Sequence, residues 1–228
     1  MSLQLSAGPY VDFGAACRPT GALTVCGWCR VGNPALVNTV LHCTNSGTPL
    51  GYFFSVRPNS GSYQKAFAGL VRSADGAAYY QRIGSTDVTT GAYFHLAATF
   101  QASTSAPEMR LYVNGNEETY QYQVPGAFAG IGYSAALQMG YYSGYGAAHI
   151  ELFDLRVYNR PLGAAEVKSI AEGHGSDGIT GGLLARWLLN EGPGGQPCAS
   201  VPDYSGNAVT GTPQNGAPVY AAAPLRVY

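Results

Sequence analysis

The chain consists of short runs of apolar residues, or of alternating apolar and polar residues, each broken by glycine, proline or asparagine. A period of two is typical of strands that bury one face, and runs this short are not typical of helices. Asn114 and Gly115 directly follow one run, and this dipeptide favours a tight hairpin because both residues tolerate positive φ. We therefore expect strands at residues 10–13, 23–31, 37–43, 50–56, 65–72, 79–83, 94–101, 109–113, 136–141, 149–158 and 182–188.

One segment instead has a helical pattern. Pro161 opens it, apolar residues recur at helical spacing as far as Glu172, and Gly173 follows. Proline at the start and glycine after the end are common boundary signals of a helix. Many strands with one short helix indicate an all-β protein, and we expect two antiparallel sheets packed as a jelly-roll sandwich.

Length and composition agree with one domain of this kind. The chain has 228 residues, 46% hydrophobic and 11% charged, which is not the composition of a disordered chain. One all-β sandwich can fill this length, so we expect a single domain over residues 1–228. The tail at 183–228 is dense in proline and glycine and too small for a good core of its own. We expect it to pack on the main sandwich.

Charge and hydropathy argue against two classes of partner. Lys and Arg number 12 against 13 Asp and Glu, so the chain lacks the basic excess of a nucleic-acid binder. No run approaches the about 20 apolar residues that cross a bilayer, so we expect no membrane insertion.

No basic region followed by an apolar run opens the chain, so its location is unknown. We expect the cell exterior, the cell surface or a virion.

The five cysteines are Cys17, Cys26, Cys29, Cys43 and Cys198. The spacing of Cys26 and Cys29 is found in redox and zinc sites. In a strand, however, residues three apart point to opposite faces, so these two sulfurs cannot share a metal or a simple disulfide. We expect buried free thiols that pack as small hydrophobic side chains.

Four segments resemble motifs of laminin G-like modules. Tyr93-Phe-His-Leu-Ala-Ala-Thr-Phe100 and Met109-Arg-Leu-Tyr-Val-Asn-Gly115 are similar to W-x-H-V-A-x-T and L-Y-V-N-G. Ile150-Glu-Leu-Phe-Asp-Leu-Arg-Val-Tyr-Asn-Arg-Pro-Leu162 resembles I-D-E-V-R-I-Y-N-R-A-L, and Leu3-Gln-Leu-Ser-Ala-Gly-Pro-Tyr-Val11 resembles the opening L-x-F-D-G-x-x-Y-V. The resemblance runs in order over residues 3–172. It implies the concanavalin A-like jelly roll that laminin G modules share with pentraxins and legume lectins.

The tail resembles a segment that this family normally places before its opening strand. Gly182-Leu-Leu-Ala-Arg-Trp-Leu-Leu-Asn-Glu-Gly192 is similar to L-V-A-x-W-x-L-D-E-x-G, and Asp203-Tyr-Ser-Gly-Asn207 is similar to D-x-S-G-N. We favour a permuted order in which residues 183–228 complete the same sandwich. A swap of this segment between subunits and a truncated second repeat are the alternatives. We expect Asp203 to form an Asx-type turn with Ser205 and Asn207.

The resemblance raises the question of calcium, which needs about 6–8 oxygen ligands, usually with two or more carboxylates. Pentraxins supply them from an acidic run, but the matching residues here, Tyr141-Tyr-Ser-Gly-Tyr145, contain no carboxylate. Asp154 matches the acid of the family's I-D-E motif. Asp154 with Asp12 is therefore the remaining candidate for one structural calcium, against hydrogen bonding of Asp154 to nearby loop amides. We expect no other cofactor.

The implied fold also occurs in retaining glucanases, which use two carboxylates about 5 Å apart. The nearest pair here is Glu151 and Asp154. These residues are three apart, so strand alternation predicts that they face opposite ways. We therefore expect a protein that is not an enzyme.

Tyrosines are the remaining functional signal. Tyr141, Tyr142 and Tyr145 lie in a glycine-rich loop at a strand end, and Tyr79 and Tyr80 form a second set. Exposed aromatic rings suit the C–H faces of sugars, and tyrosine is also enriched at protein interfaces. These five tyrosines are our candidate ligand-binding residues.

Two functions fit these signals. The first is a carbohydrate-binding module that holds a glycan on aromatic rim loops, with Tyr120 and Tyr122 expected on one face as a third aromatic set. The second is a structural or adhesive subunit of a larger assembly, such as a virion decoration or fibre protein. The partner is then a glycan or a protein, and a tail that bridges subunits would give a homo-oligomer.

Overall fold

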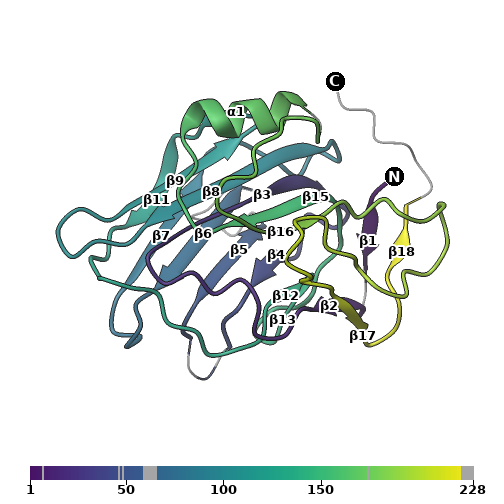
Figure 1. Ribbon diagram of the computed structural model, residues 1–228, viewed down its shortest axis with the longest axis horizontal. Coiled ribbons are helices and arrows are strands. Elements are labelled where there is room, and N and C mark those ends of the chain that lie inside the picture. The colour runs from purple at the N-terminus through teal and green to yellow at the C-terminus, as the bar shows by residue number, and fades with distance from the viewer. Residues whose placement is uncertain (7, 46, 48, 59–65, 174, 222–228) are drawn as a thin grey trace.

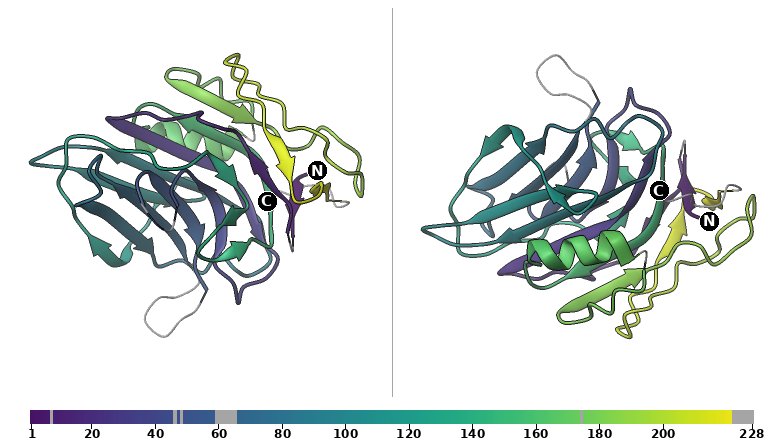
Figure 2. Two further views of the ribbon diagram at one scale, coloured as in Figure 1. Left: turned by 90° about the horizontal axis from the view of Figure 1, so that it is seen from below. Right: turned by 90° about the horizontal axis from the view of Figure 1, so that it is seen from above.

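The computed structural model describes residues 1–6, 8–45, 47, 49–58, 66–173 and 175–221. Two large antiparallel sheets pack face to face, and one helix lies on the outside of the sandwich (Figures 1 and 2). The all-β jelly-roll sandwich predicted from the sequence is therefore confirmed. Within the described ranges, no helix has the length and apolar character needed to cross a membrane.

Sheet A contains β1 (Leu3–Leu5), β3 (Ala22–Val31), β8 (Phe94–Gln101), β9 (Glu108–Val113), β10 (Asn116–Glu117), β15 (Ile150–Tyr158), β16 (Leu183–Trp187) and β18 (Val219–Tyr220). Its order is β10-β9-β8-β3-β15-β1-β18, and β16 also pairs with β15. The two longest strands, β3 and β15, are neighbours at its centre. The turn expected at Asn114 and Gly115 joins β9 to β10, and both residues have positive φ.

Sheet B contains β2 (Tyr10–Asp12), β4 (Asn38–His42), β5 (Tyr52–Val56), β6 (Phe67–Arg72), β7 (Tyr79–Gly84), β11 (Tyr120–Val124), β12 (Gln138–Met139) and β17 (Thr212–Gln214). Its order is β11-β7-β6-β5-β4-β12-β2-β17. A separate small hairpin is formed by β13 (Tyr141–Tyr142) and β14 (Gly146–Ala147). Most expected strands are present. The run expected from residue 65 is seen from Phe67, and Lys65 lies outside the described residues.

Helix α1 (Ala164–Gly173) begins three residues later than the sequence pattern predicted. The backbone N–H of Gly163 donates to the Glu166 carboxylate at 2.9 Å, which is the reciprocal half of a capping box. Val167 and Ile170 are buried against the outer face of sheet A. The helix thereby covers the part of that face formed by Cys26, Ala97, Tyr112 and Tyr158.

The helix explains why β3 is apolar on both faces. Cys29 belongs to the main core between the sheets, whereas Cys26 belongs to the cluster beneath the helix, with Tyr158 and Val167. The prediction that these two sulfurs point to opposite faces is confirmed. All five cysteines are buried and free, as expected.

The tail pairs with strands from the body of its own chain. β16 pairs with β15, β17 pairs with β2, and β18 pairs with β1 (Figure 1). Trp187 is fully buried, its ring lies 4.2 Å from that of Phe13, and its Nε1 donates to the Val209 carbonyl at 2.7 Å. These pairings support the expectation that residues 183–228 complete the sandwich.

Candidate functional site

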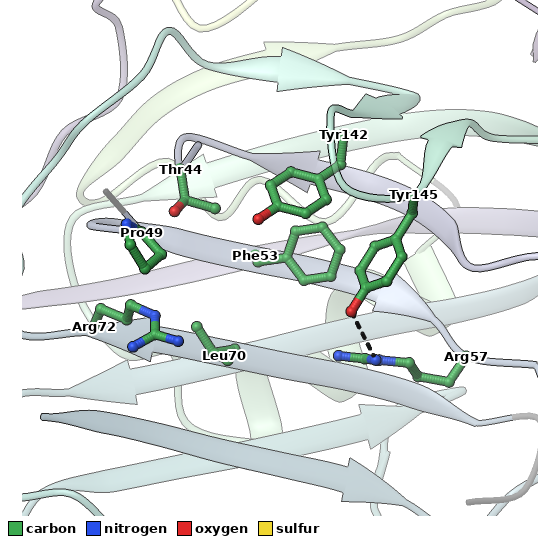
Figure 3. A pocket seen from close by; sticks show the side chains of 8 residues that line it. All are labelled: Thr44, Pro49, Phe53, Arg57, Leu70, Arg72, Tyr142 and Tyr145. Atoms are coloured by element: carbon green, nitrogen blue, oxygen red, sulfur yellow. Dashed lines mark hydrogen bonds between the residues drawn. The ribbon is translucent and has the colours of Figure 1, made fainter. Parts of the chain in front are cut away.

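A groove runs across the outer face of sheet B, away from sheet A. Its deeper part is a pocket of about 120 Å³ lined by Thr44, Pro49, Phe53, Arg57, Leu70, Arg72, Tyr142 and Tyr145 (Figure 3). A shallower hollow of about 300 Å³ is lined by Arg57, Leu70, Arg72, Tyr79, Gln81, Ile83 and Tyr122. Because the two share three residues, we treat them as one continuous site and call it the outer groove.

Strand register explains how the floor of the outer groove is built. Tyr52 and Phe54 belong to the core between the sheets, so Phe53 between them points outward. Leu70 lies directly opposite Phe53 on the next strand, and Gln81 lies opposite Leu70. Opposed residues of antiparallel strands share a face, so these three side chains form a row across β5, β6 and β7.

Three aromatic rings form what we call the aromatic platform: Phe53, Tyr142 and Tyr145. The ring of Phe53 lies 4.9 Å from Tyr142 and 5.9 Å from Tyr145, and the two tyrosine rings are 5.4 Å apart. Figure 3 shows the three rings side by side above the sheet. Tyr145 is 46% exposed, so the platform reaches solvent at its edge.

The hairpin of β13 and β14 decides which loop tyrosines reach the groove. Gly140 and Gly146 have φ of 83° and 80°, conformations that favour glycine and that flank the turn. Tyr142 projects into the outer groove, but Tyr141, the next residue in the strand, lines neither hollow of the outer groove. Tyr141 stacks on Tyr10 instead, with ring centroids 5.0 Å apart. Of the three loop tyrosines predicted, the structure brings two together.

The second predicted pair is divided in the same way. Tyr79 lines the outer groove, whereas Tyr80 is buried in the core with its ring 5.9 Å from that of Phe100. Adjacent residues of β7 face opposite sides of the sheet. Tyr80 is therefore corrected from a ligand-binding candidate to a core residue.

Tyr120 and Tyr122 do not share a face, contrary to the expectation. The register of β11 against β7 shifts between these two residues, so a bulge interrupts the alternation. Tyr122 packs beside Ile83 on the outer face. Tyr120 packs against the main core, and the guanidinium of Arg82 lies 4.1 Å from the centre of its ring.

His42 packs beside the aromatic platform, directly opposite Phe53 on the neighbouring strand. It is 2% exposed, its ring meets that of Tyr142 edge-on at 5.2 Å, and its Nδ1 lies 2.9 Å from the Thr44 carbonyl oxygen. Burial lowers the pKa of His42 to about 4, so the ring is neutral at pH 7. Burial also raises the pKa of Tyr142, which keeps its hydroxyl protonated.

The outer groove is basic. The guanidinium of Arg57 lies 5.5 Å from the ring centre of Tyr145 and donates to its hydroxyl at 3.4 Å. The guanidinium of Arg72 lies 5.0 Å from the ring centre of Tyr79, the residue opposite it on β7. None of the described residues that line the groove is acidic. The site therefore presents two positive charges beside aromatic rings.

The calcium candidates Asp154 and Asp12 lie in different sheets, and each is already engaged by side chains of the protein. Asp154 is 1% exposed and pairs with Arg156 at 2.6 Å and with Arg186 at 2.7 Å, so its oxygens are already engaged by guanidinium groups. Asp12 lies in the other sheet, where it accepts from Gln138 at 2.9 Å. In the described part of the chain, no three His, Cys, Asp or Glu side chains gather in a way that could hold a metal ion.

Glu151 and Asp154 were expected to face opposite sides of a regular strand. A bulge between Phe153 and Arg156 interrupts the alternation on which this expectation depended. The two acids nevertheless have separate partners. Glu151 is 6% exposed, pairs with Arg30 and accepts from the hydroxyl groups of Ser2 and Tyr93. Neither acid lines the outer groove.

Most residues of the outer groove do not stand out in the sequence. Phe53, Leu70 and the two arginines were not candidates, although they lie in β5 and β6 or directly after β5. One signal was present: Tyr52-Phe-Phe54 places three aromatic residues in succession within a strand. Alternation requires that at least one of them leave the core. The turn expected at Asp203 is present, since its carboxylate accepts from the Ser205 N–H at 2.9 Å.

Comparison with known proteins identifies the family. A laminin G model, described as the concanavalin A-like lectin/glucanases superfamily, matches residues 5–168. The chain belongs to this superfamily, which confirms the resemblance seen in its motifs. No curated protein sequence matches the chain.

Several solved structures share the fold at low sequence identity. A Bacteroides ovatus protein provisionally named as carbohydrate-binding has a TM-score of 0.66 and 16% identity, covering 100% of this chain and 61% of its own. A SAP-like pentraxin from Limulus polyphemus has a TM-score of 0.56 and 15% identity, with 77% and 84% covered. The CBM40 of the Ruminococcus gnavus IT-sialidase has a TM-score of 0.52 and 16% identity, with 75% and 96% covered. This chain thus spans under two thirds of the Bacteroides protein.

Proposed function

We propose that this protein is a non-catalytic carbohydrate-binding module and that the outer groove holds the sugar. The observation that carries this proposal is the aromatic platform of Phe53, Tyr142 and Tyr145, which lies open beside the polar groups of one pocket. Sugar rings present apolar C–H faces that stack on aromatic rings, and their hydroxyl groups need convergent polar partners. The groove supplies both.

The polar partners come from the walls and floor of the groove. The hydroxyl groups of Thr44 and Tyr142 and the amide of Gln81 each provide donors and acceptors, and Arg57 and Arg72 provide donors. A binding site that fixes orientation with a few polar groups on an apolar surface is typical of small-ligand recognition. The lack of acidic residues among those described in the lining supports binding without glycoside hydrolysis, which needs two carboxylates.

The relatives support the same assignment. The Bacteroides ovatus protein is provisionally named as carbohydrate-binding, and the Ruminococcus gnavus structure is a carbohydrate-binding module attached to a sialidase. The reported relatives give no support to the alternative of a virion decoration or fibre protein. Adhesion and assembly into a homo-oligomer remain proposals that belong to the alternative function, a structural or adhesive subunit.

A glycan array tests the proposal. We expect wild-type protein to bind a defined set of saccharides and Tyr142→Ala to weaken that binding about tenfold or more, equivalent to about 1.4 kcal/mol. The control is Tyr204→Ala, because Tyr204 is 49% exposed and does not line the groove. Circular dichroism of both variants checks that the fold is retained.

Three results would contradict this function. A blank array from folded protein that forms a stable oligomer in light scattering favours an assembly role. Equal losses in Tyr142→Ala and Tyr204→Ala place the sugar outside the groove. Turnover of a β-glucan that Glu151→Gln abolishes would show an enzyme instead.

A further inference from the structure

Resting on the proposed function, we infer that the outer groove selects anionic saccharides and that Arg57 and Arg72 bind the carboxylate or sulfate group. Guanidinium groups match both anions because their planar fork donates two parallel hydrogen bonds. The ligand class is therefore sugars that carry an acidic substituent, and Arg57 and Arg72 are the residues that recognise its charge.

The partners of these two arginines differ from those of most other described arginines. Five arginines pair with carboxylates of this chain: Arg30, Arg110, Arg156, Arg160 and Arg186. Two others, Arg18 and Arg82, also lie over tyrosine rings without a carboxylate partner among the described residues, but their guanidinium groups donate to backbone carbonyl oxygens. Among the described residues, Arg57 and Arg72 have aromatic rings, and for Arg57 one tyrosine hydroxyl, as their side-chain partners. Their charges are not neutralised within the described structure.

The positions of Arg57 and Arg72 in the pocket are the second observation. Both arginines line the deeper pocket, and Figure 3 shows them at its two ends with Leu70 between them. Among the described residues, the Nε of Arg57 is buried without a hydrogen-bond acceptor. Leaving a buried donor unsatisfied is costly, and an anionic oxygen in the pocket would relieve that cost.

The charge of the groove lining around the two arginines is the third observation. The whole chain is close to neutral at −1, yet the groove lining carries two positive charges and, in its described residues, no negative one. A concave surface of one charge sign concentrates ligands of the opposite sign. The aromatic platform supplies stacking for any sugar, so the arginines are the groups that distinguish an acidic sugar from a neutral one.

Three probes on one sugar backbone test this distinction: galactotriose, trigalacturonate and sulfated galactotriose. In calorimetric titration, wild-type protein should bind an acidic probe at least about tenfold more tightly than galactotriose. A difference of this size corresponds to one hydrogen bond to a charged group. Comparing trigalacturonate with the sulfated probe shows which anion is preferred. Raising the salt concentration should weaken binding of the acidic probe and leave neutral binding unchanged, since ions screen exposed charges.

Substitutions then test whether Arg57 and Arg72 are the residues that recognise the anionic group. Arg57→Gln and Arg72→Gln should each lower the affinity for the acidic probe about tenfold more than the affinity for galactotriose, because the neutral sugar loses only a hydrogen-bond donor and the acidic sugar also loses its opposite charge. Arg57→Lys should recover part of the affinity, because it keeps the charge but not the planar fork. Lys168→Gln is the matched control, since this exposed lysine lies on the helix at the outer face of sheet A.

Two outcomes overturn different claims. If galactotriose and the acidic probes bind equally, and both arginine variants match wild type, the charge selection is wrong while the carbohydrate-binding function stands. If folded protein binds none of the three probes and no saccharide on the array, the proposed function fails and this inference fails with it.

Discussion

At the scale of single residues, the groove depends on side chains that are buried without charge. His42 is the clearest case, because it lies beside Phe53 on the neighbouring strand and meets Tyr142 edge-on, with ring centroids 6.2 Å and 5.2 Å away. Its burial lowers its pKa from an ordinary 6.5 to about 4. A protonated ring in this position would place a poorly solvated charge under the aromatic platform.

The pH dependence of stability follows from this shift. Between pH 6.5 and 4 the unfolded chain binds a proton at His42 and the folded chain does not, so stability falls as the pH is lowered through this window. Urea unfolding at several pH values should show this decline, and His42→Gln should show a shallower one. An unchanged slope in the variant would mean that His42 does not contribute.

At the scale of elements, a buried ion network joins three segments on the outer face of sheet A. Arg156 on β15 pairs with Asp154 at 2.6 Å and with Asp177, after the helix, at 2.8 Å. Arg186 on β16 pairs with Asp154 as well. Burial alone would raise the pKa of Asp177, but hydrogen bonds from Arg156 outweigh it and lower the pKa to about 2. Asp177 therefore stays charged until the pH falls well below 3.8.

Removing one partner of this network should be costly. We expect Asp154→Asn to lower the free energy of unfolding by about 3–5 kcal/mol, because it leaves buried guanidinium charge uncompensated. The control is Glu172→Gln, whose exposed pair with Lys168 at 3.7 Å should contribute about 0–1 kcal/mol. Urea unfolding of both variants measures the difference. Equal effects would mean that the network is not a stabilising link.

At the scale of the whole molecule, the tail contributes to both sheets. β16 and β18 extend sheet A, and β17 forms the edge of sheet B next to β2. β1 and β16 pair with the two halves of β15, and their contacts are separated at Asp154, where φ is 46°. The bulge there lets one strand carry two successive neighbours.

Truncation of the tail should destabilise the entire sandwich. We expect Trp187→Ala to cost about 3–5 kcal/mol, since it empties a fully buried site between the sheets. Deletion of residues 183–228 should remove β16, which pairs with the second half of β15, and should abolish cooperative thermal unfolding. A truncated chain that unfolds with unchanged stability would refute closure by the tail and favour the truncated repeat.

Local features of the sequence determined the fold class, the helix and the orientation of the cysteines. These follow from side-chain alternation and from turn chemistry, which act over a few residues. Alternation failed where a bulge shifts the register, between Tyr120 and Tyr122 and at Asp154. A bulge is set by contacts with neighbouring strands, so no pattern within one strand reveals it.

The outer groove was decided by the tertiary structure. Its residues come from several strands of sheet B and the β13–β14 hairpin, and it is the strand order that brings them together. The sequence identified Tyr79, Tyr142 and Tyr145 because aromatic residues in a turn-rich segment stand out. It did not identify Arg57 and Arg72, because an arginine at a strand end has an ordinary sequence context. Only the packed sheet shows whether a carboxylate lies beside such an arginine.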